Sequence, residues 1–531
     1  MLEDHALITR IVSRFHIIVT VVVALVGAAI LGISAGEGDF FGIYVGIFGA
    51  AFIGIMIALG EKYWLVLVFA FTTQLPAIPI KDRMLEFPEI AAVLCAGAFL
   101  VRCAVKRQKF SIFRREHVPM LMYVGWVMVI FALNPVGLID AGAALGGARF
   151  YAKILLALAV FLIMANQEVT EKDCKTIIVL LLVGYLLETI YQISIFFLPL
   201  HLIGLDAGVP LMNDPDSYYS WHQALAGLPM ILICLGFARY SAAELFSFRR
   251  LWAVIGFGFC VFVIALSGKR AAVGAIPFFA ICAAAVRREW GFLVLWLTGA
   301  TIAAGILVIG HGDLFSLPLT IQRAFSVLPA KWDSELQGME GGKDNFRAEL
   351  RREAMKKIEK DPWFGTGYQV NLSLAQTLTA QYAARGGDTE LQVAPFAMGS
   401  AWHNTWLGYA ADFGIPASVI AGIIYLTVIR RGYRTFRASP AHSLTQMLAM
   451  YILLFTLRDL AFSHTGGHSA NDAFTRWWMY GLLVSLAIAN KKRTATEPTA
   501  KVQAGGHAAL HHQYADHPAR QPIRMQRPQL H

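Results

Sequence analysis

The chain has 531 residues, of which 57% are hydrophobic and only 15% are charged. A soluble domain could not bury so much apolar surface in its interior. The formal net charge of +10 would suggest a nucleic-acid partner in a soluble protein, but here the basic residues fall in alternate loops between apolar runs. The composition therefore excludes soluble and nucleic-acid-binding classes and indicates a membrane protein.

Repeated apolar runs of about 18 to 25 residues predict an all-α fold, a polytopic transmembrane helical bundle of about 12 to 14 spans. The third candidate is short, and the thirteenth contains Arg458 and Asp459, which we interpret as an internally neutralised pair. The candidate spans cover roughly 17–34, 41–59, 63–80, 88–104, 119–134, 150–165, 177–198, 222–238, 251–266, 271–286, 290–310, 404–429, 444–462 and 472–490.

The basic loops give the predicted orientation. They follow the fourth, eighth, tenth, twelfth and last spans, and by the positive-inside rule they and both termini are cytoplasmic. This predicts four parts: an N-terminal transmembrane bundle (1–310), a large external loop with an interfacial helix (311–402), C-terminal transmembrane helices (403–490) and a disordered cytoplasmic tail (491–531).

Two groups of cations break this rule on the external side. Arg149 and Lys153 open the sixth span, where they could meet lipid headgroups or an anionic ligand. Lys269 and Arg270 follow Gly268 in a very tight turn. They could also extend to headgroups, but we favour an anionic ligand, because a turn with glycine also offers backbone N–H groups to phosphate.

The external loop contains a predicted helix over Lys343–Lys360, which Asp344 or Asn345 could cap. An apolar stripe and a basic face predict that this helix lies on the bilayer surface. The stripe consists of Phe346, Leu350, Ala354 and Ile358, and the basic face of Arg351, Arg352, Lys356 and Lys357. Pro362 ends the helix, and Gly365 and Gly367 supply a bend.

A His-Asn pair, His403 and Asn404, stands between this loop and the next apolar run. A histidine near a membrane boundary can bind an anion when charged or accept a proton when neutral, because its pKa lies near neutrality. The sequence leaves both roles open for His403.

Three pieces of the chain then stand in a fixed order. They are Ser267-Gly268-Lys269-Arg270, then Arg347 followed by Pro362, Gly365 and Gly367, then His403-Asn404 with Leu407 and Gly414. Together they resemble the O-antigen ligase and polymerase superfamily of bacterial membrane glycosyltransferases, over roughly residues 251 to 430. The sequence departs from the family at Arg351, where tryptophan is frequent, and at Asp412, where glutamate is frequent.

The resemblance implies a C-type glycosyltransferase-like helical fold in the bacterial inner membrane, with the active site on the periplasmic side. It implies an undecaprenyl-diphosphate-linked glycan as donor and a glycan or the lipid A core as acceptor. Carried over, Arg347 and His403 are catalytic and Arg270 binds the donor diphosphate, with Lys269 and Asn404 beside it. Two arginines can meet the charge of a diphosphate leaving group without a metal, so we expect neither metal nor cofactor.

A transporter or flippase of lipid-linked saccharides is the alternative. That class predicts internal repeats and charges near the middle of the membrane, whereas the sequence shows no clear repeat and places its exceptional charges at the external boundary. A purely structural anchor would not need the Lys269-Arg270 turn. Ligase and polymerase share the donor chemistry, and the sequence leaves the choice between them open.

Overall fold

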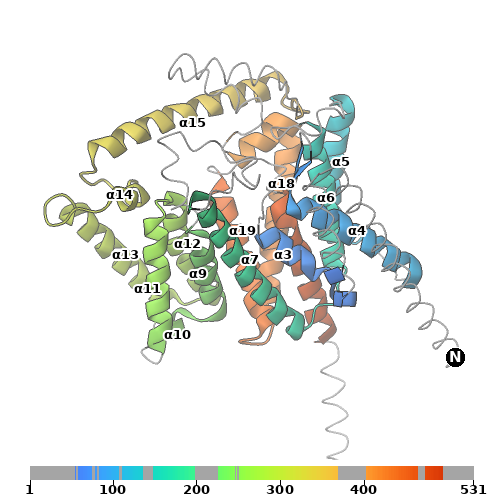
Figure 1. Cartoon of the computed structure of the whole chain (residues 1–531), viewed down its shortest axis with the longest axis horizontal. Helices are drawn as coiled ribbons and strands as arrows, with labels where there is room; N and C mark the ends of the chain where they lie inside the picture. The colour runs from blue at the N-terminus through green and yellow to red at the C-terminus, as the bar shows by residue number, and fades with distance from the viewer. Residues whose placement is uncertain are drawn as a thin grey trace, which may run out of the picture.

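The computed structural model is a bundle of helices with one small hairpin (Figure 1). It describes residues 54–55, 58–73, 78–80, 83–106, 111–135, 147–197, 225–245, 247, 250–368, 402, 404–463 and 473–493. The first predicted span, most of the second, and the tail beyond residue 493 lie outside these ranges.

Among the described residues, 7 helices are long and apolar enough to cross a membrane. They are α4 (Phe87–Lys106), α6 (Ala148–Ala165), α7 (Glu171–Phe197), α12 (Arg270–Arg287), α13 (Trp290–Gly310), α18 (Thr405–Ala438) and α19 (Leu444–Ala461). Shorter apolar helices are α5 (Val118–Leu133), α9 (Gly227–Arg239) and α11 (Leu251–Leu266). A further helix covers 473–493. These helices coincide with the fourth to the fourteenth predicted spans, which confirms the polytopic helical bundle.

The third predicted span is wrong. After the short helix η1 (Gly60–Lys62), α3 (Leu65–Thr73) has only 9 residues. At 1.5 Å per residue it reaches about 14 Å, against about 30 Å for the hydrocarbon core. The chain continues into an antiparallel hairpin, β1 (Ile78–Ile80) with β2 (Arg83–Leu85), in which Ile78 lies opposite Leu85. The run is apolar because α3 is buried against α4 and α7.

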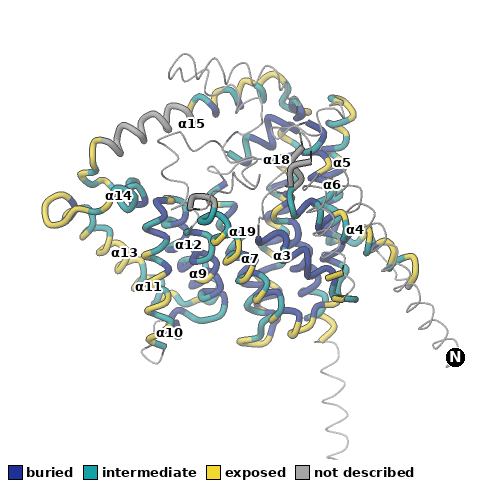
Figure 2. The backbone as a smooth tube through the Cα atoms, in the orientation of Figure 1, coloured by how far each residue is buried: buried dark blue, intermediate teal, exposed yellow. Residues whose placement is uncertain are grey.

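Burial divides the bundle into a core and a periphery (Figure 2). The packed centre includes α3, α9, α18 and α19, whose contacts bury side chains such as Phe413 and Tyr451. In contrast, α13 packs beside α12 and turns large apolar side chains outward, among them Leu295, 66% exposed, and Ile309, 74% exposed. Such a surface matches the hydrocarbon of a bilayer.

Helix α15 (Ser334–Lys360) lies across one end of the bundle, above the short helix α14 (Leu319–Phe325) (Figure 1). We call this the α15 end. The short helix α10 (Ala242–Leu245) lies near the opposite end (Figure 1). Helix α15 begins earlier than predicted, with Asp333 at its N-cap position, so the expected cap at Asp344 or Asn345 is wrong. Leu, Gln, Met and Glu in 335–340 favour helix and extend it in the N-terminal direction.

The apolar stripe of α15 packs on protein. Leu350 and Ala354 are 0% exposed in a cluster with Trp402 and Ala411, and Ile358 packs against this cluster. The side chain of Phe346 lies outside the described part of the chain. The stripe is therefore real over 350–358, but the expectation that it faces the bilayer is wrong there, because the start of α18 covers it.

Helix α18 is broken at Gly414, whose φ of 80° and ψ of 166° are not helical. Pro416 follows two residues later and lacks the N–H that a helix would use. The helix therefore consists of a short first part, 405–413, and a long second part, 415–438.

The bend after α15 docks on this break. Thr366 N donates to Ala411 O at 3.0 Å, and Gly367 N donates to Asp412 O at 2.8 Å. These bonds satisfy carbonyl groups that lose their helical partners where α18 stops. The bend over 361–368 is therefore part of the termination of the first part of α18, although Thr366 and Ala411 are 45 residues apart in the chain.

Two further hydrogen bonds satisfy backbone groups at the break in α18. Ile415 N donates to Pro362 O at 2.8 Å, and the indole of Trp126, from α5, donates to Phe413 O at 2.8 Å. The three consecutive carbonyls of 411–413 thus all accept hydrogen bonds from outside the helix. In an apolar medium this is a condition for a non-helical segment, because an unsatisfied carbonyl costs several kcal/mol, on the order of a full hydrogen bond.

Two glycines allow the bend after α15 to approach the break in α18 closely. Gly365 has a φ of 67°, and a Cβ there would lie 2.6 Å from the backbone of 412–414. A Cβ on Gly414 would overlap the carbonyl of Trp363. Neither position can hold a larger residue without moving the two backbones apart.

We expect Gly414→Ala to destabilise the protein by about 1 to 3 kcal/mol, because alanine strains the backbone at this φ and ψ and displaces the docked bend. Gly236→Ala is the matched control, since Gly236 lies inside α9 and no atom beyond the neighbouring backbone of its own helix comes within 4 Å of its Cβ position. Thermal unfolding of the purified proteins in detergent measures the difference. Equal midpoints for the two variants would contradict the proposed constraint.

Candidate functional site

The predicted cations Arg149 and Lys153 form internal ion pairs. Arg149 donates to Glu89 at 3.0 and 2.8 Å, and Lys153 donates to Glu86 at 2.7 Å. Lys153 is 3% exposed. Both interpretations from the sequence, lipid headgroup and anionic ligand, are therefore replaced by neutralisation between α6 and the start of α4.

The turn between α11 and α12 has the tight geometry that its sequence predicts. Ser267 Oγ donates to Ile264 O at 2.6 Å and accepts from Lys269 N at 3.3 Å, and Gly268 has a φ of 67°. Helix α12 begins at Arg270, and no side chain caps it. Because the first N–H groups of a helix carry partial positive charge, they add to the charges of Lys269 and Arg270 at this end.

Helix α14 packs against this turn. A Cβ on Gly268 would lie 3.3 Å from Thr320 O and 3.8 Å from Cδ of Arg323. Arg270 Nη1 donates to Ser326 Oγ at 3.5 Å. Arg323 is thus a third cation beside Lys269 and Arg270. Arg323 was not predicted as a site residue, because only the fold brings α14 back to the turn.

Arg347 lies on α15 and is half-buried. Helix α14 contacts α15 on one side and both α11 and α12 on the other. It therefore links the helix that carries Arg347 to the turn that carries Arg270, at the α15 end of the bundle (Figure 1). Arg352, on the exposed side of the same helix, pairs with Glu349 at 2.8 Å.

Asn404 is the N-cap residue of α18. Its Oδ1 accepts from Trp406 N and Leu407 N, both at 3.1 Å. Asparagine is among the best residues for this position, because its side chain satisfies N–H groups that the first turn leaves open. His403, the residue before it, lies outside the described residues.

Trp402, on the other side of His403 in the chain, is held in a buried contact between α15 and α18. Its indole Nε1 donates to Asp412 Oδ1 at 3.1 Å, and Lys357 Nζ lies 4.6 Å from the centre of its ring. Trp402 is 1% exposed and Asp412 is 0% exposed. Burial lowers the pKa of Lys357, and the carboxylates of Asp412 and Glu353 oppose this shift. The sequence predicted neither this contact nor a half-buried Lys357.

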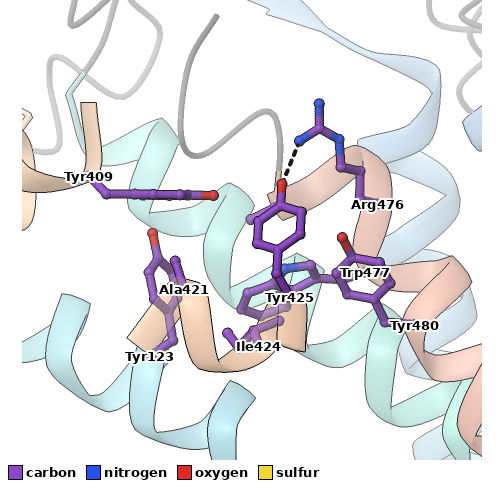
Figure 3. Close-up of a pocket in the computed structure, with 9 residues that line it drawn as sticks. Tyr123, Tyr409, Ala421, Ile424, Tyr425, Arg476, Trp477 and Tyr480 are labelled. Atoms are coloured by element: carbon purple, nitrogen blue, oxygen red, sulfur yellow. Dashed lines mark hydrogen bonds between the residues drawn. The ribbon is translucent and has the colours of Figure 1, made fainter. Parts of the chain in front are cut away.

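A second polar group lies between α5, α18 and the helix over 473–493 (Figure 3). Arg476 donates to the hydroxyl of Tyr425 at 3.0 Å and pairs with Asp459 at 2.8 Å. Asp459 lies 3.7 Å from Arg458, so its principal partner is Arg476 and the predicted Arg458–Asp459 pair is only part of the arrangement. The adjoining cavity of about 10 Å³ has room for a single water.

The described helices define a multi-pass helical membrane protein in which α14 joins the tight basic turn to α15. The family model described as O-antigen ligase matches residues 255–422, a segment that includes the turn, α15 and the His403-Asn404 pair. No curated protein compared with the chain matches it. The family match supports the O-antigen ligase superfamily, as the resemblance predicted, and with it a membrane glycosyltransferase of the O-antigen ligase type.

The capping role of Asn404 and its predicted role in donor binding can be tested separately. Asn404→Ala removes the cap and should cost about 1 kcal/mol of stability, whereas Asn404→Asp keeps an accepting oxygen and should not. If Asn404 also contacts the donor diphosphate, the added negative charge of Asn404→Asp should raise the donor KM.

Ser443→Ala is the control, because Ser443 caps α19 by accepting from Gln446 N at 3.1 Å. It should lose similar stability and leave the donor KM unchanged. Thermal unfolding and donor titration of the three variants provide the measurements. An unchanged donor KM in Asn404→Asp would restrict Asn404 to its capping role.

Proposed function

We propose that this protein transfers a glycan from an undecaprenyl-diphosphate carrier to a sugar hydroxyl of an acceptor, at the periplasmic face of the bacterial inner membrane. The acceptor is another glycan or the lipid A core, and the reaction needs no metal. The observation that carries the proposal is the turn at Ser267–Arg270, inside the matched segment, where α14 adds Arg323 to two adjacent cations.

The chemistry of this reaction fits such a cluster. When the bond between the glycan and the diphosphate breaks, negative charge develops on the leaving phosphate. Arginine side chains stabilise that charge through paired hydrogen bonds to phosphate oxygens. Arg270 starts α12, and Arg347 lies on α15, so we assign the two to opposite sides of one diphosphate, with Lys269 beside Arg270.

His403 completes the proposed site. A neutral imidazole can accept the proton of the attacking hydroxyl, and a charged one can bind the diphosphate. Its chain neighbours are both held in place, Trp402 by Asp412 and Asn404 by the first turn of α18. The described residues on both sides of His403 in the chain are therefore fixed by side-chain hydrogen bonds.

The charge distribution supports a periplasmic α15 end. Helix α12 runs from Arg270 at that end to Arg287 at the other. There Arg287 donates to Phe237 O and Ala238 O and shares a surface with Arg437. Basic residues gathered at the end opposite α15 are the pattern of a cytoplasmic surface.

Purified protein incubated with a polyprenyl-diphosphate glycan in excess chelator tests the activity. With lipid A core present, a ligase yields glycan joined to the core. Without it, a polymerase yields lengthened glycan on the carrier. Mass spectrometry of the products separates these outcomes. The absence of any new glycosidic bond, with translocation of the lipid-linked donor in vesicles, would favour the flippase alternative.

The role of the arginines is tested with charge kept constant. Arg270→Lys and Arg347→Lys should each lower turnover by about tenfold or more, because an ammonium cannot reproduce the paired hydrogen bonds of guanidinium. Arg352→Lys is the control on α15, since Arg352 is 67% exposed and pairs with Glu349. His403→Ala should abolish transfer in a folded, membrane-inserted protein. Wild-type turnover in His403→Ala or in either of the first two variants would refute the site.

A further inference from the structure

The polar contact of Trp402 with Asp412 and Lys357 lies between α15 and α18, where Trp402 and Asp412 are both buried. The indole hydrogen bond is 3.1 Å long, and the ammonium of Lys357 lies 4.6 Å from the ring centre. The contact joins three segments: the end of α15, the residue before His403, and the last turn of the first part of α18.

Burial of a carboxylate is energetically unfavourable compared with apolar packing of the same space. Removing an ionised group from water costs several kcal/mol, on the order of its lost hydration, unless hydrogen bonds and a nearby cation compensate. Asp412 has both forms of compensation, from the indole and from Lys357, whose pKa the carboxylate raises against the effect of burial. Around it, Leu350, Ala354 and Ala411 already supply apolar packing.

The polar contact fixes the orientation of the Trp402 indole. Apolar packing tolerates several orientations of an indole, whereas a hydrogen bond from Nε1 selects one. Trp402 immediately precedes His403 in the chain, and the backbone of Asp412 is itself held by Gly367 N at 2.8 Å. The carboxylate is thus anchored to the break in α18 and in turn anchors Trp402.

We propose that Asp412 is a positioning residue for the transfer reaction, acting through Trp402 on the segment that carries His403, with Lys357 as the cation that compensates its charge. This inference rests on the proposed function. Asp412 touches neither donor nor acceptor in this role. Its effect is on turnover, because a displaced base slows the chemical step while the diphosphate site at Arg270 keeps its affinity.

The test compares Asp412→Asn, Trp402→Phe and their double variant. Each single variant should lower kcat by about tenfold and change the donor KM by less than about threefold. The double variant should be no slower than the slower single variant, because both remove the same interaction. Asp412→Glu keeps the carboxylate, as the family often does here, and should retain kcat within about threefold of wild type.

Trp406→Phe is the matched control. Trp406 also lies in α18, and its indole donates to Ser463 Oγ at 2.7 Å, so its loss removes an equivalent bond elsewhere. It should match Trp402→Phe in thermal midpoint but keep wild-type kcat. The inference is overturned if Asp412→Asn and Trp402→Phe keep the kcat of this control, if their effects add, or if the donor KM rises in place of a fall in kcat.

The two proposals fail separately. If His403→Ala transfers glycan at the wild-type rate, the proposed function fails together with this inference. If His403→Ala is inactive while Asp412→Asn and Trp402→Phe are as active as wild type, only the positioning role is refuted. Should Asp412→Asn not fold, Trp402→Phe and Asp412→Glu still decide, because they keep the carboxylate buried with its charge.

Discussion

A transmembrane helix can stop only where other groups satisfy its carbonyls, and this requirement governs the α15 end of the protein. The carbonyls of 411–413 accept from Thr366, Gly367 and Trp126. One donor side chain comes from α5, and two backbone groups come from the bend after α15. The break in α18 thus exists only in combination with a distant segment.

This mutual dependence explains how α15 and the bend after it acquire a fixed position. The bend over 361–368 is bound to the break, and the apolar stripe of α15 covers the first part of α18. Helix α14 joins the same helix to the basic turn. The basic turn, α15 and the break in α18 are therefore held relative to one another by backbone hydrogen bonds and packing. A site with groups from several elements needs such a fixed arrangement.

The sequence predicted the helices well and their contacts poorly, for physical reasons. Long apolar runs have only one stable form in a bilayer, so α11 was predicted with the bounds that the structure shows. The predicted span over 63–80 was wrong, because a helix buried inside protein is as apolar in sequence as a helix that faces lipid. The stripe at Leu350 and Ala354 was recognised, but periodicity does not reveal whether lipid or α18 covers it.

In the candidate site, too, local features were predicted and contacts between distant segments were not. The tight turn at Gly268 follows local rules and was predicted at the right position. The start of α18 was also predicted near residue 404, but the capping role of Asn404 was not recognised. Arg323 and the contact of Asp412 with Trp402 were missed, because each depends on segments that meet only in the folded chain. A carboxylate in an otherwise apolar stretch was the available signal for Asp412.

The ion pairs between α4 and α6 have an evolutionary consequence. Arg149 and Lys153 share the carboxylates of Glu86 and Glu89, and Lys153 and Glu89 are almost completely buried. Loss of one partner would leave an uncompensated charge in a place with little water, which is strongly destabilising. Among descendants of one ancestor, these four positions should therefore be inherited or replaced as opposite-charge pairs, so that their covariation records the contact between the two helices.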